Sequence, residues 1–462
     1  MTASSLPRCD AVVLFGATGD LAAKMIFPAL AKLRADGVEV PIIAVGHART
    51  TPEALLARAS ERHAAVEPDV ARAVAGLAAC VRTVAGDLGD PAVYADIGKA
   101  LGSSNVPLHY LAVPPQLFGR VVEHLAHGGL VREGRVAVEK PFGHDLASAR
   151  ALERGIEAAL PRSMILRIDH FLGKDPLRNL AWMRHSTAWL EPLWSGTHVR
   201  SVQVTMAEDF GLDGRGAFYE KVGALRDVFQ NHLLELVALI AMEPASPADP
   251  AAYNAARLDA LRAIPPIAPD DVVYGQFASY REIPDVAAGS EVPTYLAVRL
   301  HVEAPRFAGV PFVIRAGKRL PLTSTVASLH LTRSRTLHQD AAGMPSDFLR
   351  FRLGPGAVDV SLDTQRLATG SSGTPAPLTL RGDLPRDEDR DAYVNLLRAA
   401  LDGDTSMSEN AAGVTAAWRI VEDVLRADVP VHRYADGSWG PPEADRLLPP
   451  GERWYDPPPE RE

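Results

Sequence analysis

Cysteine is nearly absent from this sequence: Cys9 and Cys80 are the only two among 462 residues. Two cysteines exclude a disulfide framework and a thiolate metal cluster, and they are compatible with a reducing compartment. The sequence also lacks an apolar run long enough to span a bilayer, and its N-terminus lacks the apolar core of a signal peptide. We therefore expect a cytoplasmic protein with no membrane partner.

An excess of positive charge is also absent, because 48 Lys and Arg stand against 57 Asp and Glu, for a net charge of -9. This balance argues against a general attraction to nucleic acid or to an anionic membrane. Any binding of an anion must then be local. The composition, 47% hydrophobic and 23% charged, is that of a globular protein, and the length predicts two domains.

The first third of the chain alternates short apolar strands with helical stretches, which predicts a parallel sheet covered on both faces. The expected strands are Ala11–Phe15, Pro41–Gly46, Leu108–Val113 and Arg135–Val138, and the expected helices include Ala22–Arg34 and Pro52–Arg62.

After about Leu166 the pattern changes. Alternation of apolar and polar residues over Val199–Met206 and Tyr295–Glu303 predicts antiparallel strands, and the long apolar run Val228–Met242 predicts a mostly buried helix. The Pro- and Gly-rich stretches Glu243–Pro250 and Leu353–Pro377 predict loops, and the Pro-rich tail from Leu448 predicts irregular structure.

The first expected strand runs directly into G-A-T-G-D-L-A, Gly16 to Ala22, and then into a helical pattern. Small residues at Gly16, Gly19 and Ala22 allow a tight turn, close backbone approach and close helix packing. A dinucleotide pyrophosphate would then lie at the N-terminus of the helix. The alternative is an ordinary glycine turn between a strand and a helix.

The second expected strand ends in V-G-H-A-R, with no carboxylate to hold the adenine ribose hydroxyls and with Arg49 in that place. An arginine there suits a ribose 2′-phosphate, so the sequence favours NADP over NAD. The alternative is a solvent-exposed arginine in a loop.

The chain resembles the glucose-6-phosphate dehydrogenase family in an ordered set of motifs. They are G-A-T-G-D-L-A, Y-L-A-V-P-P, V-E-K-P-F-G, R-I-D-H-F-L-G-K-D, R-D-V-F-Q-N-H, R-A-G-K-R-L and Y-A-D-G-S-W-G-P, and they extend from Gly16 to Pro441. The resemblance implies an α/β Rossmann-type NADP-binding domain over residues 1–168. An α+β substrate-binding and oligomerisation domain with a large, mostly antiparallel sheet would follow over residues 169–462, in a homodimer or homotetramer.

The resemblance also implies a set of site residues, with glucose 6-phosphate or a related sugar phosphate as substrate and with no metal. The residues expected to bind the cofactor are Gly16, Ala17, Thr18, Gly19, Asp20, Leu21, Arg49, Tyr110 and Lys140. Those expected to bind the substrate are Lys140, His170, Lys174, Glu208, Asp227 and Lys318.

Two of these motifs could instead be ordinary exposed segments with no role in binding. Asp175 and Pro176 suit the start of a helix, so His170–Lys174 would lie on the approach to a helix N-terminus, but a solvated charged turn would look similar. Lys140 closes a strand and would lie at the carboxyl end of the sheet, where ligands bind, although a lone E-K-P is usually an exposed lysine before a turn. Resemblance further implies a cis bond before Pro141.

His232 is the expected general base and Asp169 the carboxylate that orients it. On an α-helical wheel His232 falls beside Leu225, Val228 and Leu236, away from the polar residues Arg226, Asp227, Gln230 and Asn231, which by itself favours a hydrogen-bonded core histidine. By resemblance, His232 removes the C1 hydroxyl proton while hydride leaves C1 for the nicotinamide, and Asp169 stabilises the imidazolium.

The sequence departs from the family pattern at three places. Phe171 stands where many members have tyrosine, Thr323 replaces a second basic residue beyond Lys318, and only Lys24 remains of the lysines that follow the glycine loop. These departures leave open a paralogue that acts on another hexose phosphate. A sugar oxidoreductase of the glucose–fructose oxidoreductase type and a non-catalytic paralogue are further alternatives.

Overall fold

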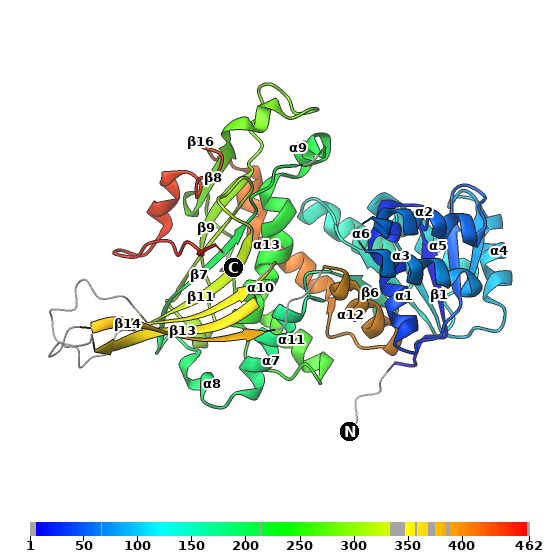
Figure 1. Cartoon of the computed structure of the whole chain (residues 1–462), viewed down its shortest axis with the longest axis horizontal. Helices are drawn as coiled ribbons and strands as arrows, with labels where there is room; N and C mark the ends of the chain where they lie inside the picture. Colours follow the sequence, from blue (N-terminus) through cyan, green and yellow to red (C-terminus); the bar gives the residue numbers. More distant parts are fainter. Residues whose placement is uncertain are drawn as a thin grey trace. The chain divides into compact units, whose positions relative to one another are not determined.

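The computed structural model describes residues 6–65, 67–212, 214–332, 347–355, 358–367, 375–384 and 389–459. The chain forms two compact units (Figure 1). Unit 1 comprises Met1–Asp175, Pro247–Asn254 and Glu388–Thr415, and unit 2 comprises Pro176–Ser246, Ala255–Asp387 and Ala416–Glu462. Among the described residues, no helix has the length and apolar character needed to cross a membrane.

Unit 1 contains a seven-stranded sheet within the described residues. Its order is β15 (Ser408–Glu409), β6 (Ile165–Ile168), β5 (Arg135–Glu139), β4 (Pro107–Leu111), β1 (Ala11–Phe15), β2 (Ile42–Gly46) and β3 (Val81–Ala85). All neighbours pair in parallel except β15, which pairs antiparallel with β6. The Rossmann-type order around β1 confirms the expected α/β domain.

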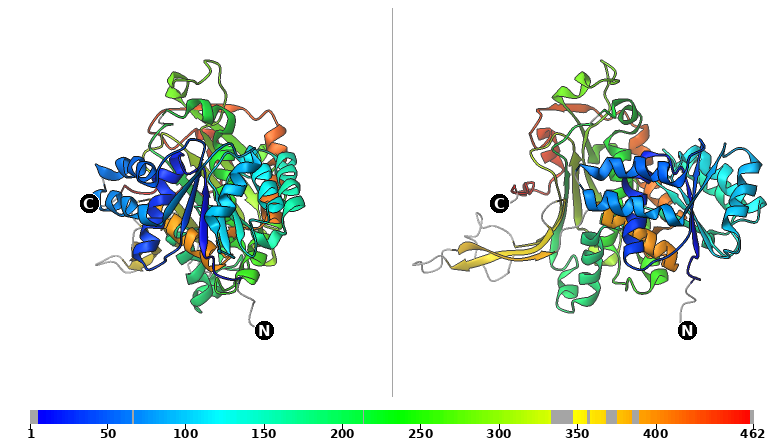
Figure 2. Two further views of the ribbon diagram at one scale, coloured as in Figure 1. Left: turned by 90° about the vertical axis from the view of Figure 1, so that its right-hand side faces the viewer. Right: turned by 45° about the vertical axis from the view of Figure 1, so that its right-hand side comes forward.

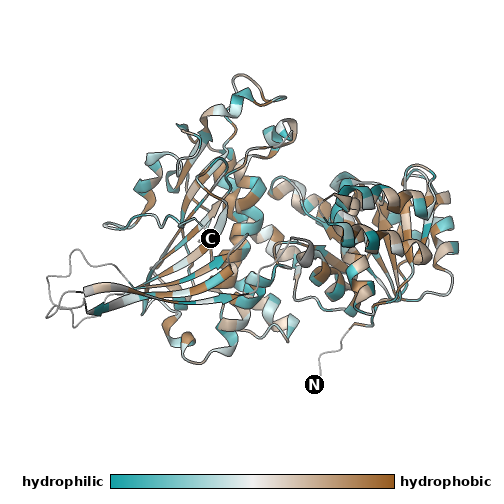
Figure 3. Cartoon of the chain, viewed as in Figure 1, coloured by the Kyte–Doolittle hydropathy of each residue, from teal (hydrophilic) through white to brown (hydrophobic). Residues whose placement is uncertain are grey.

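Helices cover both faces of this sheet (Figure 2, left). They are η1 (Ala22–Ile26), α1 (Phe27–Ala35), α2 (Pro52–Ala64), α3 (Pro68–Ala75), α4 (Pro91–Leu101), α5 (Phe118–His127), α6 (Leu146–Ala159) and α12 (Asp389–Asp402). Because both faces are covered, the central strands β1 and β2 are apolar throughout and β3 to β6 are mostly apolar, as the brown strands of Figure 3 show. Val12 and Leu14 of β1 pack in one core with α1 and with Leu397 of α12.

The chain returns to unit 1 after β14, before the last strand of the unit 2 sheet, β16, is formed. We expected one boundary near residue 168, but α12 packs on α1 and β15 extends the sheet at β6. Both segments lie more than 200 residues beyond that boundary. They join unit 1 because α12 carries apolar residues, such as Leu396 and Leu397, that complete the core over β1 and β4.

Unit 2 is built on a nine-stranded sheet within the described residues. Its order is β14 (Pro375–Leu384), β13 (Val358–Leu367), β12 (Phe348–Leu353), β11 (Ser324–Leu331), β7 (Val199–Ala207), β10 (Pro311–Gly317), β9 (Tyr295–His301), β8 (Val272–Phe277) and β16 (Val431–Tyr434). Only β7 with β10 and β8 with β16 pair in parallel among these described strands. The expected large, mostly antiparallel sheet is confirmed.

Further helices precede, interrupt or follow the strands of this sheet. They are α7 (Asp175–Ser186), α8 (Leu190–Leu193), α9 (Gly216–Ala224), η5 (Leu225–Leu233), α10 (Leu234–Ala241), α11 (Pro250–Arg262) and α13 (Ala411–Arg426). The segment η5 is a π-helix and α10 is fully buried, so the apolar run that predicted one helix here forms two joined segments of different pitch.

The long loop expected over Leu353–Pro377 is wrong, because β13 and the start of β14 occupy much of it. These consecutive strands pair antiparallel with each other over ten residues, and this ladder outweighs the turn-forming composition. Residues 356–357 and 368–374 of that segment lie outside the described residues. The tail from Leu448 is irregular as far as residue 459.

Candidate functional site

The glycine turn after β1 is shaped by the neighbouring strand. Gly16 adopts a φ of 77°, and a Cβ there would lie 2.2 Å from the backbone oxygen of Ala112, which follows β4. Ala17 donates its N–H to the oxygen of Val45 at 3.0 Å, so β2 holds the turn from the other side. The turn leads directly into η1 and α1. A residue without a side chain is therefore required, which fits a backbone cradle for a pyrophosphate.

The remaining residues expected at the cofactor are distributed around this turn, mostly at the surface. Gly19 and Asp20 are exposed, and Thr18 and Leu21 are half-buried. Asp20 forms ion pairs with Arg62 at 2.6 Å and with Lys24 at 3.7 Å. Because its charge is already balanced by these cations, Asp20 adds less repulsion to a nearby phosphate than an isolated carboxylate would.

Arg49 is exposed in the loop that follows β2, whereas Tyr110 lies on β4 inside the sheet. Tyr110 is fully buried and donates its hydroxyl proton to Glu139. Burial, together with the negative charge of Asp169, raises the pKa of Glu139 to about 8. The side chain of Tyr110 thus belongs to the interior of the sheet, whereas the adjoining loop at Ala112 contacts the glycine turn.

Lys140 lies at the carboxyl end of β5, as the sequence predicted, and its bond to Pro141 is cis. Its ammonium nitrogen is 2.8 Å from Oδ2 of Asp169 and also forms an ion pair with Glu409. The other oxygen of Asp169 accepts the backbone N–H of Phe171 at 2.9 Å. The chain therefore gathers one ammonium and two carboxylates at this edge of the sheet.

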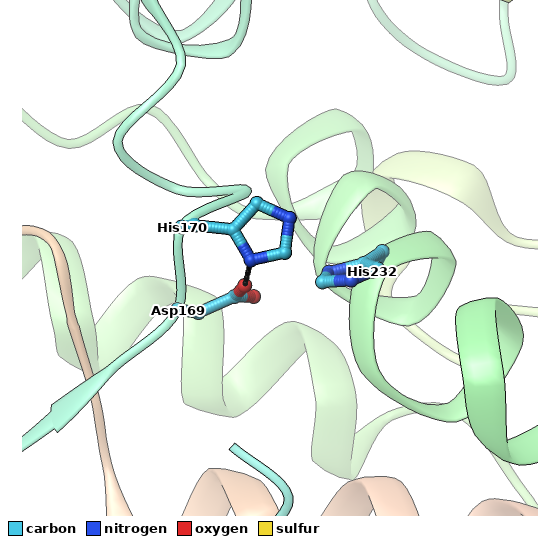
Figure 4. Close-up of side chains that lie close together, drawn as sticks. All are labelled: Asp169, His170 and His232. Carbon is cyan, nitrogen blue, oxygen red and sulfur yellow. Dashed lines mark ion pairs between the residues drawn. The ribbon is translucent and has the colours of Figure 1, made fainter. Parts of the chain in front are cut away.

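His170 follows Asp169 and turns toward α12. Its ring is stacked on Tyr393 with 6.2 Å between the centroids, and its Nδ1 lies 3.9 Å from Oδ1 of Asp169, the ion pair drawn dashed in Figure 4. Asn395 of α12 donates to the oxygen of Gly173 at 2.9 Å and to Asp175 at 3.0 Å. The segment expected to hold the sugar phosphate is thus fixed by α12.

A second cluster of expected substrate residues forms inside unit 2. Lys318, at the end of β10, is almost fully buried and forms ion pairs with Glu208 and, at 3.5 Å, with Asp227. Its ammonium also lies 5.5 Å from the ring of Phe210 and 5.4 Å from that of Tyr219. Three residues that lie far apart in the sequence, and that the resemblance assigned to the substrate, are therefore brought together.

His232 lies on η5, half-buried, near the end of that π-helix (Figure 4). The α-helical wheel placed it away from Asp227, and this expectation is wrong because the segment is not an α-helix. A π-helix bonds residues five apart, so the turn is wider and positions 227 and 232 lie on nearer sides of it. The backbone N–H of His232 is bonded to Oδ1 of Asn231 at 2.6 Å.

The departures from the family pattern have local partners. Phe171 is buried. Thr323 donates its hydroxyl to Asp209, whose backbone N–H donates to Thr323 in return at 3.0 Å. Glu409, Asn395 and Tyr393 were not expected at the site. No local signal could have found them, because they reach it through α12 and β15, far along the chain.

Comparisons with known proteins cover nearly the whole chain. The family model "Glucose-6-phosphate dehydrogenase, NAD binding domain" matches residues 13–179, and "Glucose-6-phosphate dehydrogenase, C-terminal domain" matches residues 181–455. Glucose-6-phosphate 1-dehydrogenase 1 of Mycobacterium tuberculosis is 38% identical over 97% of this chain and 96% of its own.

Solved structures agree with these matches. The crystal structure of glucose-6-phosphate 1-dehydrogenase from Mycobacterium avium has a TM-score of 0.90 at 37% identity, covering 98% of this chain and 100% of its own. A glucose-6-phosphate dehydrogenase in complex with its substrate glucose 6-phosphate has a TM-score of 0.88 at 28% identity, covering 99% and 100% of the two chains.

Proposed function

Since the chain belongs to the glucose-6-phosphate dehydrogenase family, we propose that it oxidises D-glucose 6-phosphate to 6-phospho-D-glucono-1,5-lactone with NADP as the oxidant. This reaction is the first step of the oxidative pentose phosphate pathway. The observation that carries the proposal is the match of both family models, which together extend from residue 13 to residue 455.

The cofactor fits the residues of unit 1. The glycine turn provides the cradle for the pyrophosphate, and Arg49 supplies a cation after β2 for the ribose 2′-phosphate. When bound, NADP supplies a hydride acceptor at C4 of its nicotinamide ring, so that oxidation at C1 yields the lactone and NADPH. In this proposal Lys140 contacts both the cofactor and the sugar phosphate.

We assign the remaining roles residue by residue. His232 removes the proton of the C1 hydroxyl, and Asp169 stabilises the resulting imidazolium. His170 and Lys174 bind the phosphate of the sugar, while Glu208, Asp227 and Lys318 hold sugar hydroxyls. The clustering of the last three residues inside unit 2 supports this assignment.

The experiment is to mix the protein with NADP and glucose 6-phosphate and follow NADPH absorbance. Turnover is expected, and its absence from protein that binds NADP cleanly would refute the proposal. His232→Asn should lower kcat by about 100- to 10,000-fold, the usual contribution of a general base, while substrate affinity is retained. His185→Asn, at an exposed position of α7, is the control and should keep full activity.

A second candidate is a dehydrogenase of another hexose phosphate. Two observations favour keeping it: Phe171 offers no hydroxyl, and the hydroxyl of Thr323 is bonded to Asp209. A panel of hexose 6-phosphates and unphosphorylated sugars decides between the two, with the larger kcat/KM identifying the substrate.

We also propose a cytoplasmic location and a homodimer or homotetramer. Residues 1–168 would serve mainly in NADP binding and residues 169–462 in substrate binding and assembly. The large sheet of unit 2 supports the last assignment, because members of this family associate through that sheet. Light scattering during gel filtration gives the mass of the assembly.

A further inference from the structure

Glu409 is held in place by a very short strand at the edge of the sheet of unit 1. The two residues of β15 pair antiparallel with β6, with Ser408 opposite Ile168 and Glu409 opposite Arg167. The hydroxyl of Ser408 accepts the backbone N–H of Arg167 at 2.9 Å. The backbone of Glu409 is therefore fixed against the strand that ends at the RIDH motif.

The pairing register sends three side chains to one face. Residues opposite each other in a sheet project to the same side, and residues two apart along a strand do so as well. Arg167 pairs with both Glu409 and Val138. Asp169 lies two residues beyond Arg167, and Lys140 lies two residues beyond Val138. Glu409, Asp169 and Lys140 therefore converge on one face.

The contacts agree with this register. Lys140 lies 2.8 Å from Asp169 and forms an ion pair with Glu409, and the exposed fractions of the three side chains are 13%, 0% and 6% in the order Lys140, Asp169, Glu409. An ammonium group withdrawn from water to this extent requires compensation by nearby negative charge. The nearby carboxyl of Glu139 projects to the opposite face, toward Tyr110.

We propose that Glu409 is a positioning residue that holds Lys140 in its ammonium form at the carboxyl edge of the sheet. With Glu409 present, Asp169 is not the sole counter-ion of Lys140. The consequence for binding of sugar phosphate and NADP rests on the proposed function, whereas the ion pair does not.

The first test measures the reactivity of Lys140 without using enzymatic activity. The full-length protein is labelled at pH 8 with limiting acetic anhydride, and acetylation of Lys140 is compared by mass spectrometry with that of Lys99, an exposed lysine 2.7 Å from Asp96. Only the neutral amine reacts, so Glu409→Gln should raise the Lys140/Lys99 ratio by roughly fivefold or more. An unchanged ratio would overturn the proposal.

Two further variants make this result specific. Glu157→Gln breaks an ion pair with Arg162 elsewhere in unit 1 and should leave the ratio unchanged. Glu409→Asp retains the charge on a shorter side chain and should give an intermediate ratio, which also decides the matter if Glu409→Gln does not fold. If Glu409→Asp and Glu409→Gln give the same Lys140/Lys99 acetylation ratio, the charge of Glu409 does not act on Lys140.

The second test is kinetic. Glu409→Gln should raise KM for sugar phosphate and for NADP by about tenfold, as expected for a charge-assisted contact, and change kcat much less. In a Lys140→Met background the same substitution should have no effect on NADP affinity. An equal effect in both backgrounds would mean that Glu409 acts elsewhere. If the wild-type protein shows no turnover, the proposed function is refuted. The acetylation ratio of Lys140 would still decide the role of Glu409.

Discussion

Gly16 and Ala112 approach so closely that a single added carbon on Gly16 would lie 2.2 Å from the Ala112 oxygen. The contact joins the turn after β1 to the loop after β4, and Ala112 also donates its N–H to Phe15 at 3.0 Å. The two loops form one backbone surface at the carboxyl ends of the central strands, which is where nucleotides bind in folds of this kind.

Gly16→Ala should therefore destabilise unit 1 by roughly 2–5 kcal/mol, the sum of a left-handed backbone and an overpacked contact, and should abolish NADP binding. Gly37→Ala is the matched control, because Gly37 has a similar φ of 87° with nothing within 4 Å of its added Cβ. The control should lose only about 1–2 kcal/mol and bind NADP normally. Urea titration and cofactor fluorescence measure the two effects, and equal losses in both variants would contradict the role of the contact.

Arg49→Ala should weaken NADP binding by about 10- to 100-fold and leave NAD binding nearly unchanged, because a charge-assisted contact to the 2′-phosphate would be lost. Arg72→Ala, another exposed arginine of unit 1, serves as the control. Isothermal titration with both cofactors gives the ratio. An equal loss for NADP and NAD would show that Arg49 does not contact the 2′-phosphate.

Lys318→Met should raise KM for the sugar phosphate by about 10- to 100-fold, because Glu208 and Asp227 would be left without their common cation. Methionine would place its thioether near the rings of Phe210 and Tyr219, where the ammonium of Lys318 lies, so the fold should persist. Lys221→Met, at an exposed position of α9, should behave as wild type. Unchanged KM in a folded variant would remove Lys318 from the substrate site.

Glu139 makes the stability of unit 1 depend on pH. Its pKa is raised from 4.5 to about 8 by burial, so the folded state binds the proton more tightly than the unfolded state. Stability contributed by this group is complete below pH 4.5 and is lost as pH rises toward 8, by up to about 1.4 kcal/mol per pH unit.

Glu139→Gln cannot ionise and should remove this decline. Hydrogen exchange of the β4 and β5 amides between pH 5 and 8, corrected for the intrinsic exchange rate, measures it. Glu133→Gln, an exposed glutamate of the same unit, should retain the wild-type pH dependence. Identical pH profiles for wild type and Glu139→Gln would show that the carboxyl is ionised throughout.

Much of unit 1 could be predicted from sequence because its signals are local. The strand Ala11–Phe15 was predicted with its observed bounds, and the place of Lys140 after β5 was correct, since apolar runs between helical stretches and a proline mark these positions. The order of the motifs along the chain further indicated the family, which the matches over both halves confirm.

Tertiary structure decided what local signals could not. The two residues of β15 carry no periodicity, so Glu409 reaches Lys140 only through pairing with β6, and β13 and β14 overcome a turn-forming composition by pairing with each other. The π-helical pitch of η5 likewise changed which residues share a side with His232. For Glu409 the deciding free energy comes from a pairing partner far along the chain, and a short window of sequence contains no record of it.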